Sequence, residues 1–120
     1  MSTYISINNN TFELAQNLRV AYEIQGQMNH TPYMDIFSKI GDMTIEDQLK
    51  ILYVAFKVKN PEEAKTLSFT AFMNAILDNP EMNVSAIMQV LKGVMSGILG
   101  KNIDEESNNN QKDNTESGNE

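Results

Sequence analysis

The feature that most constrains the fold is a stripe of apolar residues at helical spacing, which ends against a polar segment. Between positions 84 and 98 an apolar side chain recurs every three or four residues, as along one side of an α-helix: Val84, Ile87, Met88, Leu91, Val94, Met95 and Ile98. Almost no apolar residue follows Gly100. The sequence predicts a final amphipathic helix that buries this stripe, either inside its own domain or against a partner.

Upstream of this helix, the pattern predicts a mainly α (α+β) single domain. Residues 4–7 and 11–14 flank three asparagines, which tolerate the left-handed angles of a tight turn, so a β-hairpin is expected there. Four or five helices should follow, including one over 15–28, one over 32–40 and a central one that starts after Thr44. Caps are expected at Thr31, Thr44 and Asn83, and a left-handed helix stop at Gly41. The expected segments are 15–28, 32–40, 45–58, a turn or two from Pro61, 69–77 and the helix that starts at Asn83.

The last twenty residues differ from the rest in composition. Segment 101–120 holds six acidic residues against two lysines, which accounts for four of the seven net negative charges of the chain. Because it lacks the apolar area that offsets the entropy of ordering, we expect a disordered, acidic tail after a domain of residues 1–100. In the domain, lysines alternate with acids and form no uniformly basic face, so nucleic acid is not an expected partner.

The residue types exclude the common catalytic and metal sites. The chain has no cysteine, and His30 is its only histidine, so sites that pair histidine with a second imidazole or a thiolate cannot form within one subunit. No glycine-rich phosphate loop is present. The apolar region 84–100 is short for a bilayer span and carries Gln89 and Lys92. We therefore expect a cytoplasmic protein that is not an enzyme and needs no cofactor, metal or membrane.

The final helix offers a candidate partner-binding face. Gly93 and Gly97 form a flat strip on which another backbone can lie closely, either from the same domain or from a partner. Methionines such as Met88 and Met95, with Met73, either fill the core or make an adaptable apolar surface. The hypothesis is a partner-binding face made of six residues: Met88, Leu91, Gly93, Met95, Gly97 and Ile98.

The opening segment YISINNNTFELAQNLRVAYEIQ resembles the start of the tail assembly chaperones of long-tailed bacteriophages. That family begins with a strand, a turn usually written Asn-Gly-Lys, a Tyr/Phe-x-Leu strand and a helix. Ile7-Asn8, Phe12 and Leu14 stand at the matching places, while Asn9-Asn10 replaces the usual Gly-Lys. The order of the later helices and the abrupt polar end are also similar, over about residues 3–100.

The resemblance implies a small protein of the infected cell's cytoplasm that binds and solubilises the tape-measure protein. It also implies recruitment of tail-tube subunits, self-association into homo-oligomers, and absence from the mature virion. A rival hypothesis is a small non-enzymatic regulator or adaptor that binds a host or phage protein, with Lys50, Lys57 and Lys59 as its contact to nucleic acid.

Overall fold

The structure, a computed structural model, describes residues 1–100; the expected disordered tail, 101–120, lies outside the described residues. The described part consists of an N-terminal β-hairpin followed by helices, which confirms the predicted mainly α class. It has six α-helices, one more than expected at most, and the shortest, α4, is a single turn. The elements are β1 (Thr3–Ile7), β2 (Asn10–Leu14), α1 (Leu18–Gln27), α2 (Tyr33–Ser38), the 3-10 turn η1 (Ile40–Asp42), α3 (Ile45–Lys59), α4 (Pro61–Ala64), α5 (Phe69–Leu77) and α6 (Val84–Leu99).

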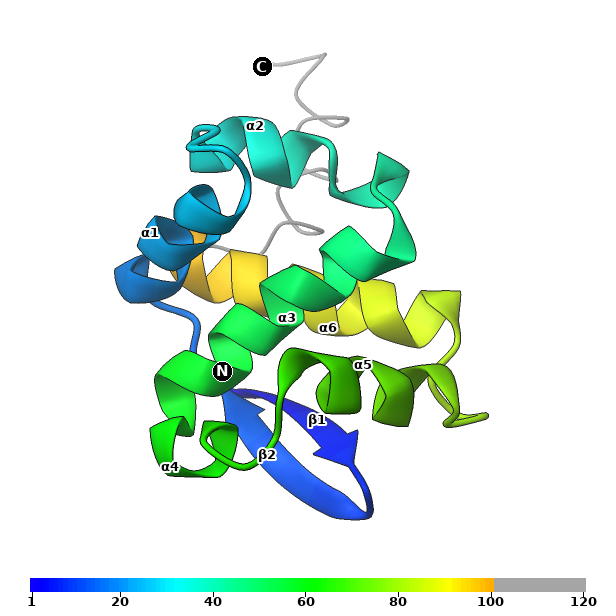
Figure 1. Cartoon of the computed structure of the whole chain (residues 1–120). Coiled ribbons are helices and arrows are strands. Elements are labelled where there is room, and N and C mark those ends of the chain that lie inside the picture. Colours follow the sequence, from blue (N-terminus) through cyan, green and yellow to red (C-terminus); the bar gives the residue numbers. More distant parts are fainter. Residues whose placement is uncertain (101–120) are drawn as a thin grey trace.

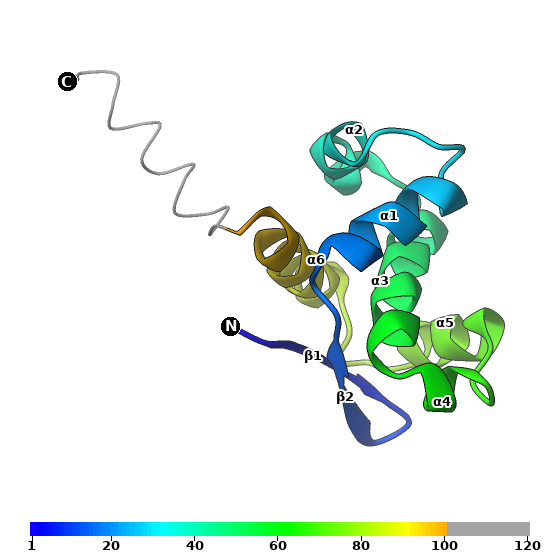
Figure 2. The ribbon, with the colours of Figure 1, turned by 90° about the vertical axis from the view of Figure 1, so that its left-hand side faces the viewer.

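Helix α3 is the central element, as its two-sided apolar pattern predicts. It contacts α1, β2, α4, α5 and α6, and it runs through the middle of the molecule in Figure 1. Leu49, Leu52 and Phe56 of α3 have no exposed surface. Figure 2 shows the hairpin at one end of the molecule, with α1 and α2 at the other and α6 alongside. The core therefore forms around α3, and the hairpin closes one side of it.

The hairpin turn is made by asparagines in left-handed backbone conformations. Asn8 and Asn9 have φ values of 52° and 69°, and Ile7 pairs directly with Asn10 across the two-residue connection. Two consecutive positive φ values are typical of a type I′ turn, whose twist suits paired strands. In this register Ile5 and Ile7 of β1 lie in the core. Asn8 and Asn9 thus form the turn without the glycine that is commonest at such positions.

Helix ends agree with some of the predicted signals. Thr44 Oγ1 accepts a hydrogen bond from the Asp47 N–H at 3.1 Å, and Asn83 Oδ1 accepts one from the Ala86 N–H at 2.9 Å. Both capping predictions are confirmed. Helix α1 begins at Leu18 instead of residue 15, because Asn17 caps it.

Two helix-end predictions are wrong. Thr31 does not cap α2: its Oγ1 donates a hydrogen bond to the Met28 carbonyl at 2.6 Å, which closes the end of the preceding turn. Gly41 lies inside the 3-10 turn η1, and its φ is not positive. A left-handed glycine instead ends α6 at Gly100, where φ is 78°.

Candidate functional site

Two of the predicted partner-binding residues are core residues. Leu91 has no exposed surface and Met95 is only 6% exposed. Both belong to the hydrophobic core of the single chain, together with Ile87 and Val94 on the same side of α6. A partner-binding role for Leu91 and Met95 therefore does not fit their burial. Most of the apolar stripe of the last helix is used within its own domain.

The glycine strip on α6 is covered by the N-terminal part of the chain. A Cβ atom at Gly93 would lie 2.5 Å from Oγ1 of Thr3, and one at Gly97 would lie 2.5 Å from Nε2 of Gln16. Of the two alternatives for this strip, the structure shows the contact within the domain. Glycine is needed because β1 and the segment after β2 pass too close to α6 for a side chain.

Met88 and Ile98 are the two predicted apolar residues that stay half-buried at the surface. Ile98 lies in the last turn of α6. Met88 lies beside α3, where its sulfur is 3.9 Å from Nε2 of Gln48. The same Nε2 donates to the carbonyl of Ile40 at 2.8 Å, so the buried amide of Gln48 has a fixed position. Met88 thus sits at the junction of α3 and α6.

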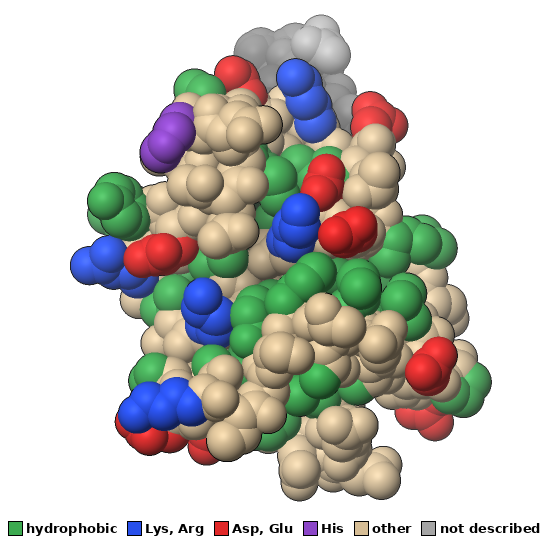
Figure 3. All heavy atoms as spheres, viewed as in Figure 1, with side chains coloured by type: hydrophobic (Ala, Val, Ile, Leu, Met, Phe, Trp, Pro, Cys, Tyr) green, Lys and Arg blue, Asp and Glu red, His purple; other side chains and the backbone are tan. Residues whose placement is uncertain are grey.

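A larger apolar surface surrounds Met88, and we call it the apolar band. Figure 3 shows hydrophobic side chains running across the face where α3, α5 and the start of α6 meet. Ile45, Leu77 and Val84, one on each of these helices, are each more than half exposed, at 53%, 52% and 72%. Half-buried side chains join them. The band consists of Ile45 and Tyr53 on α3, Phe69, Met73 and Leu77 on α5, and Val84 and Met88 on α6.

Helical spacing and ring contacts determine where the side chains of the band lie. Phe69, Met73 and Leu77 are four residues apart on α5, so they line one side of that helix. The Tyr53 ring packs against Phe69 with centroids 5.6 Å apart, and its hydroxyl donates to the Leu67 carbonyl at 2.6 Å. On α6, Val84 precedes Met88 by one turn. The three helices thus each contribute exposed or half-buried apolar side chains to the band, and two of these are methionines.

Charged residues lie along the rim of the band. Lys50 is 4.0 Å from a carboxylate oxygen of Glu46 and 3.8 Å from one of Asp47, and Lys57 lies over the Tyr53 ring at 5.7 Å. Lys59, further along α3, is 3.8 Å from Glu13. Two of the three lysines in the rival nucleic-acid hypothesis therefore share their charge with acids of this chain.

Sequence reasoning assigned Ile45 and Leu77 to buried helix faces and so missed them as surface residues. Periodicity shows which side of a helix is apolar but not how wide the neighbouring elements are. Here α5 and α6 each pack against α3, and one residue of each apolar stripe stays exposed: Ile45, Leu77 and Val84. The abundance of methionine was the signal that could have indicated such a surface.

The described residues hold no group of three or more histidine, cysteine, aspartate or glutamate side chains placed to bind a metal ion. His30 is exposed in the turn after α1, with a φ of 60°. In residues 1–100, no helix combines the length and the apolar character that crossing a bilayer requires.

Comparison with known protein families, with curated proteins and with solved structures found no match.

Proposed function

We propose that this protein is a non-enzymatic bacteriophage tail assembly chaperone, whose apolar band binds and solubilises the tape-measure protein. The observation that carries the proposal is the band itself, which leaves Ile45, Leu77 and Val84 exposed next to Met73 and Met88. Contiguous exposed apolar surface is characteristic of protein-binding sites, since it is costly to leave in water.

The composition of the band suits a helical client. An amphipathic helix binds by laying its apolar side on a matching apolar surface, and methionine adapts to side chains of different shape. A long helical protein exposes many such sides before assembly, and they associate with one another unless they are covered. The resemblance of the opening segment to tail assembly chaperones supports the tape-measure protein as this client.

The proposal extends to the setting in which such a chaperone acts. The chain works in the cytoplasm of the host cell, helps to recruit tail-tube subunits, forms homo-oligomers and is absent from the mature virion. These features rest on the resemblance of residues 3–100 to the family.

Co-expression with the tape-measure protein tests the function. Leu77→Glu and Val84→Glu place charges on exposed positions of the band, so the domain should stay folded while the amount of soluble tape-measure protein falls at least about threefold. Leu18→Glu is the matched control, because Leu18 is 73% exposed on α1, outside the band. The proposal is wrong if both band variants keep the client as soluble as the parent and Leu18→Glu do.

A further inference from the structure

The three most exposed residues of the apolar band lie where their helices begin or end. Helix α3 begins at Ile45, α5 ends at Leu77 and α6 begins at Val84. A short loop joins α5 to α6, and the 3.9 Å contact of Gln48 with the Met88 sulfur joins the first turns of α3 and α6. In Figure 1 all three helix ends lie on the right-hand side of the molecule. They therefore form one end of the band.

Two acidic residues lie in the loop that joins α5 to α6. Asp78 directly follows Leu77, and Glu81 comes before Val84. Both side chains are exposed, and within residues 1–100 neither carboxylate forms an ion pair. The last turn of α5 holds no basic residue, so the partial negative charge of its last carbonyls adds to that of the two carboxylates.

The start of α3 adds further negative charge. Glu46 and Asp47 follow Ile45, and their carboxylate oxygens lie 4.0 Å and 3.8 Å from the ammonium of Lys50. One lysine thus faces two acids, which leaves a net negative charge. We call the part of the band around Ile45, Leu77 and Val84 its acidic end.

The opposite end of the band carries a positive charge. There the Tyr53 ring packs against Phe69, at the start of α5, and the ammonium of Lys57 lies 5.7 Å from the centre of the Tyr53 ring. Lys57 is exposed, and within the described residues its ammonium forms no ion pair. An aromatic ring attracts a cation without neutralising it, so Lys57 still attracts an acidic group. We call the part around Tyr53 and Phe69 the basic end.

The two ends are about two helical turns apart. Leu77 lies eight residues after Phe69 on α5, which corresponds to about 12 Å along the helix axis. A partner helix of three or four turns therefore places its own first and last turns beside the two ends. Figure 3 shows Lys or Arg side chains to the left of the hydrophobic side chains and Asp or Glu side chains to their right.

We propose that the apolar band binds an amphipathic helix of its client in one orientation, with basic client residues beside the acidic end and acidic client residues beside Lys57. The reverse arrangement brings like charges together at both ends, which is disfavoured. This inference rests on the proposed function, because it takes the band as the client site. It adds the charge pattern by which a client helix is selected and oriented.

Two synthetic helical peptides of equal composition test the orientation with the full chain. Both are end-blocked, run for about four turns, and repeat leucine every three or four residues between a pair of lysines and a pair of glutamates. One peptide begins with the lysines and the other begins with the glutamates. Each carries a nitroxide label at its first residue, which broadens the NMR signals of nearby amides in ¹⁵N-labelled protein.

The label should report opposite ends of the band for the two peptides. In the lysine-first peptide it should broaden the amide signals of Leu77 and Val84 more than those of Tyr53 and Lys57. In the glutamate-first peptide the order should be the reverse. A third peptide, with glutamates at both ends, should bind at least about threefold more weakly at low salt, because repulsion then replaces an exposed ion pair.

A charge-reversed variant separates orientation by charge from orientation by shape. Lys57→Glu together with Asp78→Lys and Glu81→Lys exchanges the charges of the two ends and leaves every apolar side chain in place. All three positions are exposed, and a lysine beside the last carbonyls of α5 is favourable, so the domain should stay folded. In this variant each label should broaden the end opposite to the one that it broadens in the parent.

The matched control makes the same charge changes outside the band. Glu23→Lys, Asp35→Lys and Lys39→Glu lie at exposed positions of α1 and around α2, and together they should leave both labelling patterns unchanged. Equal broadening of both ends by each peptide would overturn the orientation but leave the band as a binding site. So would a label that stays at the same end in the charge-reversed variant. No broadening on the band with either peptide at millimolar concentration would contradict the proposed function as well.

Discussion

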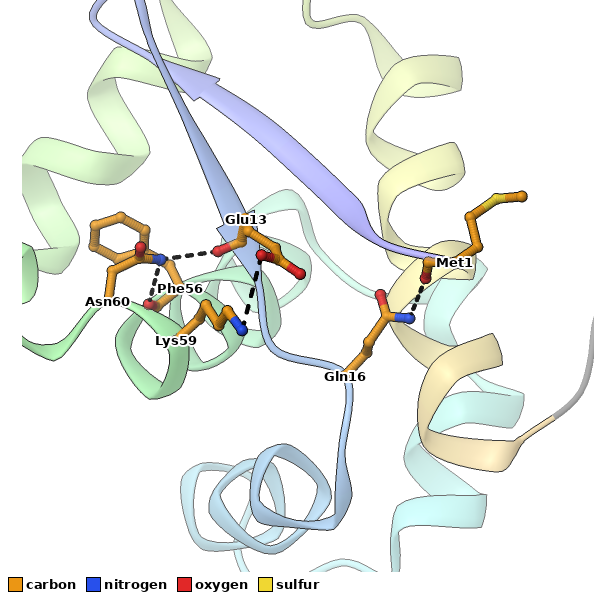
Figure 4. A network of polar contacts seen from close by, with 6 residues as sticks. All are labelled: Met1, Glu13, Gln16, Phe56, Lys59 and Asn60. Carbon is orange, nitrogen blue, oxygen red and sulfur yellow. Dashed lines mark hydrogen bonds and ion pairs between the residues drawn. The ribbon is translucent and has the colours of Figure 1, made fainter.

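Asn60, at the end of α3, donates a hydrogen bond from its Nδ2 to the main-chain oxygen of Glu13 at 2.9 Å (Figure 4). The same Nδ2 lies 3.0 Å from the Phe56 carbonyl, so one amide joins the last turn of α3 to the outer edge of β2. This contact attaches the end of the hairpin next to α1 to the central helix.

Asn60→Ala should lower the free energy of unfolding by about 1–3 kcal/mol, because it leaves the carbonyls of Glu13 and Phe56 without this donor. Urea denaturation followed by circular dichroism measures the change. Asn74→Ala is the control, since Asn74 is exposed on α5, and it should stay within about 0.5 kcal/mol of the parent. Equal stability of the two variants would contradict the role given to Asn60.

Gly93→Ala should destabilise the domain, although alanine is favoured over glycine within a helix by about 1 kcal/mol. The new Cβ would lie 2.5 Å from Oγ1 and 3.1 Å from Cγ2 of Thr3, whose branched side chain is stiff. Thr3→Ala removes both atoms, so the double variant Thr3→Ala/Gly93→Ala should recover most of the loss. A double-mutant cycle by thermal denaturation measures this coupling.

Gly26→Ala is the control for Gly93→Ala. Nothing lies within 4 Å of a Cβ at Gly26, which is also inside a helix. This variant should therefore gain about 1 kcal/mol of stability. If Gly26→Ala and Gly93→Ala change the melting temperature alike, the close approach of β1 to α6 is not what requires glycine.

Leu91→Ala should cost about 2–5 kcal/mol, because the side chain is fully buried and its loss leaves a cavity. Ile98→Ala should cost clearly less, since Ile98 is half-buried at the end of α6. Unfolding in urea distinguishes the two positions. A similar loss at both would show that the face of α6 is more evenly buried than the structure has it.

Tyr53 should make the fold sensitive to high pH. Partial burial raises the pKa of the Tyr53 hydroxyl above its usual value of 10.0, since a half-buried tyrosinate loses part of its hydration. The unfolded chain then releases this proton at a lower pH than the folded chain. The stability from Tyr53 is complete below about pH 10 and is lost as the pH rises through the folded-state pKa.

Tyr53→Phe separates this effect from the hydrogen bond of the hydroxyl. The variant should lose about 1 kcal/mol at pH 7, because the 2.6 Å bond to the Leu67 carbonyl is gone. Its stability should then fall less between pH 9.5 and pH 11 than that of the parent. Urea denaturation at the three pH values tests this. If the stability of the variant and that of the parent fall equally between pH 9.5 and pH 11, Tyr53 is not the cause of the loss at high pH.

Local features of this fold could be predicted from the sequence because their causes lie within a few residues. Asn8 and Asn9 form the hairpin turn, and Thr44 and Asn83 cap their helices, since each interaction spans at most one turn. Thr31 and Gly41 carry similar local signals but behave differently. The Thr31 hydroxyl binds the Met28 carbonyl instead of capping α2, and Gly41 lies inside the 3-10 turn η1. The apolar periodicity likewise identified the helices but not how fully each is covered.

By itself, the sequence determined that this chain forms a hairpin and amphipathic helices, because spacing and turn residues act locally. Only the tertiary structure decided which residues on the apolar side of each helix are buried and which stay exposed. It buried Leu91 and Met95, filled the glycine strip with Thr3 and Gln16, and left Leu77 and Val84 exposed. The physical reason is that burial depends on which distant segments pack against a helix. The periodicity of one segment does not show which other segments these are.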